Sequence, residues 1–70
     1  MGFYNRLLDE REQLADRIKN LDFFIKVSPA YVRLSDDMKR LLSEQLSVMR
    51  AYLSILDKRI QLIGEEYDKE

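Results

Sequence analysis

The sequence predicts an all-α protein: an antiparallel hairpin of two long helices, joined by a short helical turn, that assembles into a coiled-coil or helix-bundle homo-oligomer. Two observations predict this fold. Apolar residues recur every three or four positions on both sides of Pro29, the single proline of the chain, and this is the period of a helix face. The chain has only 70 residues and no cysteine, so one small core without disulfides needs support from association. We expect residues 1–70 to form one domain.

The first long helix is predicted over residues 2–26. Three-four spacing relates a series of positions and places them on one face: Tyr4, Leu7, Arg11, Leu14, Ile18, Leu21 and Ile25. Arg11 alone interrupts this face with a charge. Acidic and basic residues occupy the remaining faces, so this helix needs a partner along one side.

Residues 27–35 are predicted to form the turn. The residue before a proline avoids the helical region, and proline is accepted at the first position of a helix. We therefore expect the first helix to end near Val27 and Ser28 to cap a single helical turn. Ser35 is the expected N-cap of the second long helix, because Asp36 and Asp37 after it suit the positive end of the helix dipole.

The second long helix is predicted over residues 36–67 and carries two apolar stripes. The first stripe alternates steps of four and three without a break: Leu42, Leu46, Met49, Leu53, Leu56, Ile60, Ile63 and Tyr67. The second stripe has the same heptad spacing and mixes apolar with polar residues: Met38, Leu41, Gln45, Val48, Tyr52, Ile55, Arg59 and Leu62. A helix with so wide an apolar face needs at least two partners. The first helix supplies one, and we expect another copy of the chain to supply the other.

Composition argues against several functions. The chain has no histidine and no cysteine, so we expect no zinc or other metal site, no cofactor and no enzyme activity. A net charge of −1 argues against binding nucleic acid. No run approaches the roughly 20 apolar residues of a membrane span, and the first residues do not form a signal peptide. We therefore expect a cytoplasmic protein.

Gln45, Tyr52 and Arg59 form a polar file within the second stripe. In an antiparallel hairpin, Arg11 is expected near Tyr52 and Tyr4 near Arg59. Two arginines, two tyrosines and a glutamine suit an anionic, aromatic ligand, because guanidinium groups match phosphate oxygens, tyrosine rings stack on bases and an amide reads a base edge. The sequence predicts a pocket between subunits with these ligand-binding residues: Arg59, Tyr52, Gln45, Arg11 and Tyr4.

A structural role for the polar file is the alternative. Polar residues at heptad positions often set register and oligomeric state, and Tyr52 suits a core as well as a ligand. Arg11 and Arg59 would then pair with acidic residues of a neighbouring chain: Glu44, Asp57 or Asp9. A second candidate site is the positively charged group around the turn, which could hold a phosphate: Lys26, Tyr31, Arg33, Lys39 and Arg40.

Two segments carry a resemblance to known proteins: Leu21-Asp22-Phe23-Phe24-Ile25, and the spacing of Gln45, Met49, Tyr52 and Arg59-Ile60. This pattern resembles a family of tiny phage and prophage proteins related to a small crAss-like phage protein. Small helical oligomers of phages also resemble the sponges that bind a host's nucleotide immune signal. Among these, the chain resembles the Sequestin group, which captures a cyclic ADP-ribose signal of Thoeris defence. The resemblance implies a nucleotide ligand for the Arg-Tyr-Gln pocket.

Two functions remain open. The first is sequestration of a cyclic ADP-ribose-type signal, without catalysis, in pockets between the subunits of a dimer or tetramer. The alternative is a coiled-coil interaction module that binds or inhibits a host or phage protein. In either case we expect a homo-oligomer in the cytoplasm of an infected bacterium, with no membrane and no nucleic acid as partner.

Overall fold

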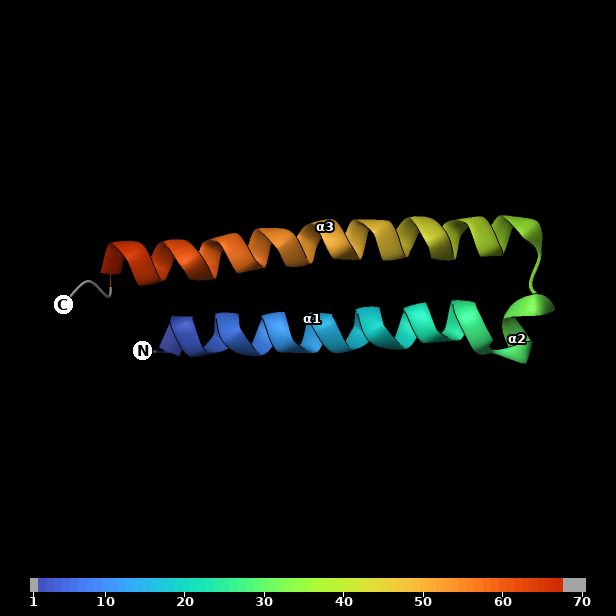
Figure 1. The fold of residues 1–70 in the computed structure, drawn as a ribbon, viewed down its shortest axis with the longest axis horizontal. Helices are drawn as coiled ribbons and strands as arrows, with labels where there is room; N and C mark the ends of the chain where they lie inside the picture. The colour runs from blue at the N-terminus through green and yellow to red at the C-terminus, as the bar shows by residue number, and fades with distance from the viewer. Residues whose placement is uncertain (1, 68–70) are drawn as a thin grey trace.

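The computed structural model describes residues 2–67 as two long helices joined by a short one (Figure 1). Helix α1 spans Gly2–Val27, α2 spans Pro29–Val32 and α3 spans Asp36–Tyr67. The long helices lie side by side and run in opposite directions, and α2 closes one end of the hairpin. The described residues contain no strand, so the predicted all-α fold with two packed long helices is confirmed. The homo-oligomer stays a prediction.

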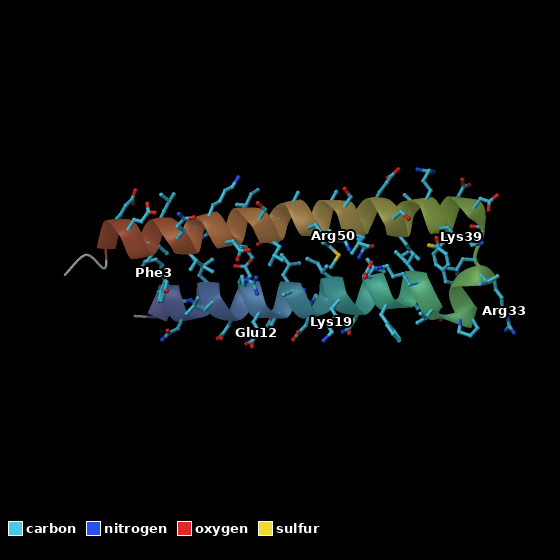
Figure 2. All side chains as sticks on the ribbon, viewed as in Figure 1. Phe3, Glu12, Lys19, Arg33, Lys39 and Arg50 are labelled. Carbon is cyan, nitrogen blue, oxygen red and sulfur yellow. The ribbon has the colours of Figure 1, made fainter. Side chains whose placement is uncertain are left out.

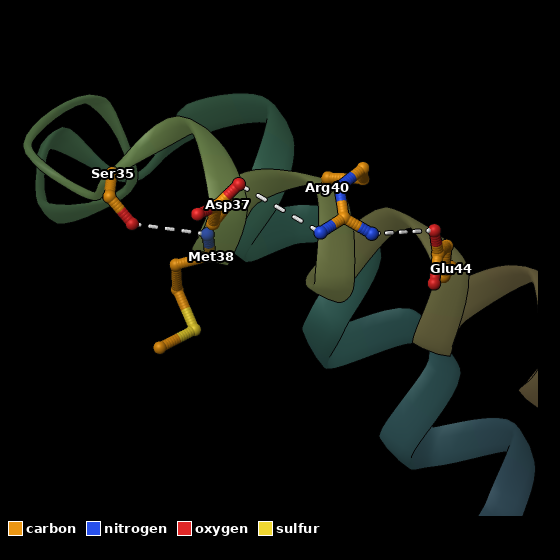
Figure 3. A network of polar contacts seen from close by, with 5 residues as sticks. All are labelled: Ser35, Asp37, Met38, Arg40 and Glu44. Atoms are coloured by element: carbon orange, nitrogen blue, oxygen red, sulfur yellow. Dashed lines mark hydrogen bonds and ion pairs between the residues drawn. The ribbon is translucent and has the colours of Figure 1, made fainter.

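Serine side chains begin the two helices that follow the turn. The backbone N–H of Ala30 donates to Ser28 Oγ at 3.2 Å, ahead of Pro29 at the first turn of α2. The N–H of Met38 donates to Ser35 Oγ at 3.1 Å, which caps α3 (Figure 3). Each bond satisfies a helix donor that has no partner within the helix. Both serine caps are therefore where the local sequence predicts them.

The first three turns of α3 also carry a small charged network. Arg40 donates to Glu44 at 3.1 Å and lies 3.8 Å from Asp37, and these pairs are drawn in Figure 3. Asp36 and Asp37 stand in the first turn, where negative charge is favourable. All of these side chains are exposed, so the network adds little to the hairpin's stability.

The turn is held against the hairpin by aromatic contacts. The Tyr31 ring meets Phe24 edge-to-face, with ring centroids 6.1 Å apart. The ammonium of Lys39, in α3, lies 5.5 Å from the centre of the Tyr31 ring. This distance allows a cation–π interaction. Ser28 N–H donates to the Phe24 carbonyl at 3.1 Å. The chain therefore reverses through an ordered turn, not a loose linker.

The core lies along one line between α1 and α3. Five side chains are buried among the residues that the structure describes: Leu7, Leu14, Ile18, Leu46 and Leu56. Partly buried residues extend this line along both helices: Leu21, Ile25, Met49, Leu53, Ile60 and Ile63. The first stripe of α3 thus faces α1, as its spacing predicts; its last member, the side chain of Tyr67, lies outside the described residues. Within residues 2–67, neither long helix has a stretch apolar enough to cross a membrane.

The second stripe of α3 faces solvent in the single hairpin. Its apolar members keep about half or more of their surface exposed, from 46% for Met38 and 51% for Leu41 to 67% for Val48. Ile55 and Leu62 are 54% and 50% exposed. One partner helix therefore covers only one of the two stripes.

Leu56→Ala should destabilise the protein by about 2–5 kcal/mol, because Leu56 is fully buried and its truncation leaves a cavity in a small core. Urea denaturation followed by circular dichroism, at one fixed protein concentration, measures the change. Ser54→Ala, on an exposed face of the same helix, is the matched control and should change stability little. Equal stability of the two variants would contradict the assigned core.

Candidate ligand-binding site

The polar file lies on the exposed side of α3, within the second stripe. Gln45, Tyr52 and Arg59 are all exposed, and they alternate along the helix with the exposed side chains of Val48 and Ile55. Two turns of helix separate successive members, about 10 Å along the axis. The file is therefore a line of polar groups set into an apolar surface.

Tyr52 is joined to α1 by a hydrogen bond from its hydroxyl to Glu10 Oε2. This bond raises the pKa of Tyr52 above its usual value, helped by partial desolvation and by the negative charge of Glu10, while the charge of Arg59 acts in the opposite direction. Tyr52 stays 41% exposed. The ring is thus anchored at its hydroxyl and open along part of its surface.

Glu10 was not among the residues that the sequence predicts for the site. It stands next to Arg11, which an antiparallel hairpin brings level with Tyr52. This position beside Arg11 is the one indication in the sequence that Glu10 could reach Tyr52. An acidic residue on a charged helix face gives no sign of its partner until the side-chain directions are known.

Arg11 points to the other side of the α1–α3 contact. Its Nε donates to Asp57 Oδ1 at 2.8 Å, and this hydrogen bond and the carboxylate's charge raise the pKa of Arg11. Asp57 and Tyr52 are five residues apart, which places them about 140° apart around the helix. Arg11 makes the kind of ion pair expected under the structural alternative, but within one chain and not between chains. The structure does not bring Arg11 and Tyr52 together.

The remaining predicted site residues differ in their surroundings. The Gln45 amide donates to Met49 Sδ at 3.8 Å, a weak contact that leaves most of its hydrogen-bonding capacity unused. Arg59 forms no ion pair with any residue of the part of the chain that is described. Tyr4 is half-buried in the first turns of α1. The Arg59 guanidinium therefore has no ion-pair partner within residues 2–67, and it lies two helical turns from the Tyr52 ring.

A second ion-pair cluster joins the helices on the Arg11 side. Asp22 accepts from Arg50 of α3 at 3.2 Å and from Lys26 of its own helix at 3.0 Å. The hydrogen bond from Lys26 is the largest influence that lowers the pKa of Asp22, with smaller contributions from Arg50. Figure 2 shows Arg50 in the space between the helices, whereas Glu12 and Lys19 project from α1 away from α3. This side of the hairpin is held by charge, and the Tyr52 side by a hydrogen bond.

The positively charged group at the turn is largely occupied by local partners. Lys26 pairs with Asp22, and Arg40 pairs with Asp37 and Glu44. Among residues 2–67, no three acidic side chains come together as a candidate metal site. Because Lys26 and Arg40 already have acidic partners, the polar file suits an anionic ligand better than the turn does.

A family model described as Sequestin matches residues 1–62. This chain belongs to the Sequestin family. The match includes α1, the turn and α3 as far as Leu62, and so all of the predicted ligand-binding residues. The expected resemblance to Sequestin is confirmed, and the relation to a crAss-like phage protein stays a prediction. Neither the curated proteins nor the solved structures contain a significant match to the chain.

The name Sequestin indicates a protein that binds and retains a signal molecule. Retention requires a surface that binds the signal molecule, and it does not require a reactive side chain. The exposed groups of the Sequestin polar file are an amide, a phenol held by Glu10 and a guanidinium. These groups donate hydrogen bonds and stack, which suits recognition of an anionic ring system.

Asp22→Asn should lower the melting temperature at neutral pH, because the ionised carboxylate holds both Arg50 and Lys26. The pKa of Asp22 is lowered in the folded state, so its contribution is present above the unfolded pKa and is lost as the pH falls through the folded value. The difference between wild type and variant should therefore shrink between about pH 5 and pH 2. Thermal melts across this range measure it. Asp16→Asn, which removes a carboxylate with no ion pair among the described residues, should show no such convergence; the same convergence in both variants would contradict the assignment.

Proposed function

We propose that this protein sequesters a small nucleotide immune signal of the cyclic ADP-ribose type, without catalysis, in pockets between subunits. The observation that carries the proposal is the position of Gln45, Tyr52 and Arg59 in an exposed apolar stripe of a Sequestin family member. The setting is the cytoplasm of a phage-infected bacterium, where removal of the signal protects the phage from Thoeris defence.

Each group of the polar file has a part in this proposal. The Arg59 guanidinium binds the pyrophosphate, because its planar fork matches two phosphate oxygens at once. The Tyr52 ring stacks on the base, and its bond to Glu10 restricts the ring before the ligand arrives, which lowers the entropy lost on binding. Gln45 donates to and accepts from a base edge or a ribose hydroxyl.

Arg11 and Tyr4 complete the proposed set from α1. Tyr4 contributes a second ring near the N-terminal end of the hairpin, on the helix opposite Arg59. Arg11 contributes a second positive charge at a distance, because its guanidinium is held by Asp57. Its effect on the ligand is therefore electrostatic and is weakened by the neighbouring carboxylate.

Sequestration needs tight binding and slow release, and it needs no reactive side chain. A site between subunits supplies both when the ligand is enclosed from two sides, since release then requires the subunits to open. The apolar residues of the second stripe, such as Val48 and Ile55, would exclude water from around the bound nucleotide. In such a desolvated site the charge–charge contact between Arg59 and the pyrophosphate becomes stronger.

A protein-interaction module is the second candidate, and the exposed second stripe favours it. A helix with apolar side chains at heptad spacing can dock against a helix of another protein. In that case Val48→Asp would abolish binding of the partner, and nucleotides would have no effect on stability. Host or phage lysate passed over immobilised wild type and Val48→Asp protein distinguishes this function from sequestration.

Arg59→Ala should abolish nucleotide binding while the protein stays folded, because Arg59 is exposed and forms no ion pair within residues 2–67. A ligand at 100 times its dissociation constant adds about 2.7 kcal/mol of stability, which raises the melting temperature of a domain of this size by roughly 10–20 °C. Thermal-shift assays with cyclic ADP-ribose isomers, and titration calorimetry with any isomer that gives a shift, measure the binding.

Arg40→Ala is the matched control, since it removes an exposed arginine from the same helix outside the polar file. This variant should bind as the wild type does. No shift of the folded wild type with any cyclic ADP-ribose isomer would refute the proposed ligand class. Equal loss in both arginine variants would instead point to the charged group at the turn, to which Arg40 belongs, or to a general effect of positive charge.

A further inference from the structure

The second stripe is a continuous, self-complementary surface. It runs from Met38 to Leu62, about 36 Å along α3, and its apolar members are about half or more exposed in the single hairpin. Its steps alternate between three and four, the spacing that packs knobs into holes. A stripe with this spacing can pack against a second copy of itself, because both copies present the same repeat.

We propose that α3 pairs with α3 of a second copy in antiparallel orientation, and that each ligand site takes Tyr52 and Arg59 from one protomer and Gln45 from its partner. The identity of the ligand rests on the proposed function above. The pairing rests on α3 alone. In this alignment Val48 lies opposite the partner's Tyr52, Gln45 opposite Ile55, and Leu41 opposite Arg59.

Charge within the stripe favours the antiparallel orientation. A parallel pair would place Arg59 opposite the partner's Arg59 in the seam, and two like charges there are unfavourable. The antiparallel pair places each Arg59 opposite Leu41, with the two arginines about 27 Å apart along the axis. At that distance their repulsion is screened by salt.

Charge beside the stripe favours the same orientation. Glu44, Ala51 and Lys58 follow one another at seven-residue intervals along one edge of the stripe. The antiparallel pair brings Glu44 beside the partner's Lys58 twice, and it places the small Ala51 next to its own copy at the two-fold axis. Asp37 would lie near the partner's Glu65 at each end, but Asp37 is already paired with Arg40 at 3.8 Å.

The angle between the two stripes determines how the four helices of such a pair would be arranged. Each residue turns about 100° around the helix, so the stripes that face α1 and the second copy are centred about 100° apart. Neighbours at nearly a right angle are the arrangement of a four-helix bundle. The antiparallel two-fold axis puts both α1 helices on the same side of the α3 pair and closes this bundle, whereas a parallel axis puts them on opposite sides.

The polar file lies at the boundary between the two stripes, so it faces the centre of the closed bundle. Glu10 of α1, which holds Tyr52, faces the same centre. Arg17 is one heptad from Glu10, and the antiparallel arrangement brings it near the partner's Glu10. The charges of the two α1 helices are therefore complementary where the bundle closes.

Register determines which residues share a site. With Gln45 level with the partner's Ile55, it falls between Tyr52 and Arg59 of that partner. The three groups then lie within about 10 Å along the bundle, which matches the length of a dinucleotide-sized ligand better than the file of one protomer does. Two equivalent sites result, and neither is complete in a single hairpin.

Cysteine cross-linking tests the pairing without any ligand, because the chain has no cysteine of its own. Met38→Cys and Leu62→Cys are prepared separately with tags of different size and are oxidised alone and as a mixture. Antiparallel pairing predicts disulfide dimers in the mixture and none in either variant alone. Self-linked dimers of each variant would show a parallel pair and overturn the proposal, as would a monomer by analytical ultracentrifugation. Both residues are exposed in the hairpin, and circular dichroism checks that the variants stay helical.

Mixing two inactive variants tests the shared site. Gln45→Ala and Arg59→Ala should each fail to bind the cyclic ADP-ribose isomer that the wild type binds. A refolded equimolar mixture should regain about a quarter of the wild-type sites, because half of the dimers are mixed and each mixed dimer has one intact site. A site within one protomer predicts no recovery, and that result would overturn the shared site.

The two proposals fail in different ways. If the mixture of Met38→Cys and Leu62→Cys cross-links but no nucleotide binds, the pairing stands and the proposed function falls with the shared site. If the wild type binds a nucleotide but the cross-links are absent or parallel, the proposed function stands and the antiparallel pairing falls.

Discussion

The width of the apolar face on α3 is the constraint on which the rest of the structure depends. The first stripe is covered by α1 and holds the buried core, including the fully buried Leu56. The second stripe is left exposed by the same packing, since one helix can cover only one side of another. A small domain seldom tolerates so much exposed apolar surface without a use for it. The fold of one hairpin thus creates the surface on which the proposed function depends.

The two edges of the α1–α3 contact differ in chemistry, and this difference orients the candidate site. On one edge, Arg11 pairs with Asp57 and Arg50 pairs with Asp22. On the other edge, Tyr52 donates to Glu10 beside the second stripe. The ion pairs are exposed and contribute modestly to stability, but they keep two basic residues away from the polar file. Arg59 is left as the guanidinium available to a ligand in that file.

The sequence predicts the hairpin well because its determinants are local and periodic. Serine before each downstream helix, one proline in the turn and unbroken three-four spacing are sufficient for the helix positions. The site is harder to predict because it depends on side-chain direction across the contact. Arg11 turns to Asp57, and Glu10 reaches Tyr52; a register uncertain by a few residues cannot separate these neighbours. The proposed assembly depends on a second copy of the chain, so neither the sequence nor the single hairpin contains its contacts.

The thin core of the single hairpin has a consequence for how the amount of folded protein depends on its expression. The five buried side chains of the described hairpin give so small a domain little stability of its own. In the proposed dimer, association and folding are linked, so the folded fraction rises with total concentration. Early in expression, scarce chains would be dilute, incompletely folded and open to proteolysis. Once the protein concentration exceeds the dissociation constant of the dimer, the number of complete ligand sites would rise more steeply than the number of chains. Binding of the ligand would therefore have a threshold in protein concentration.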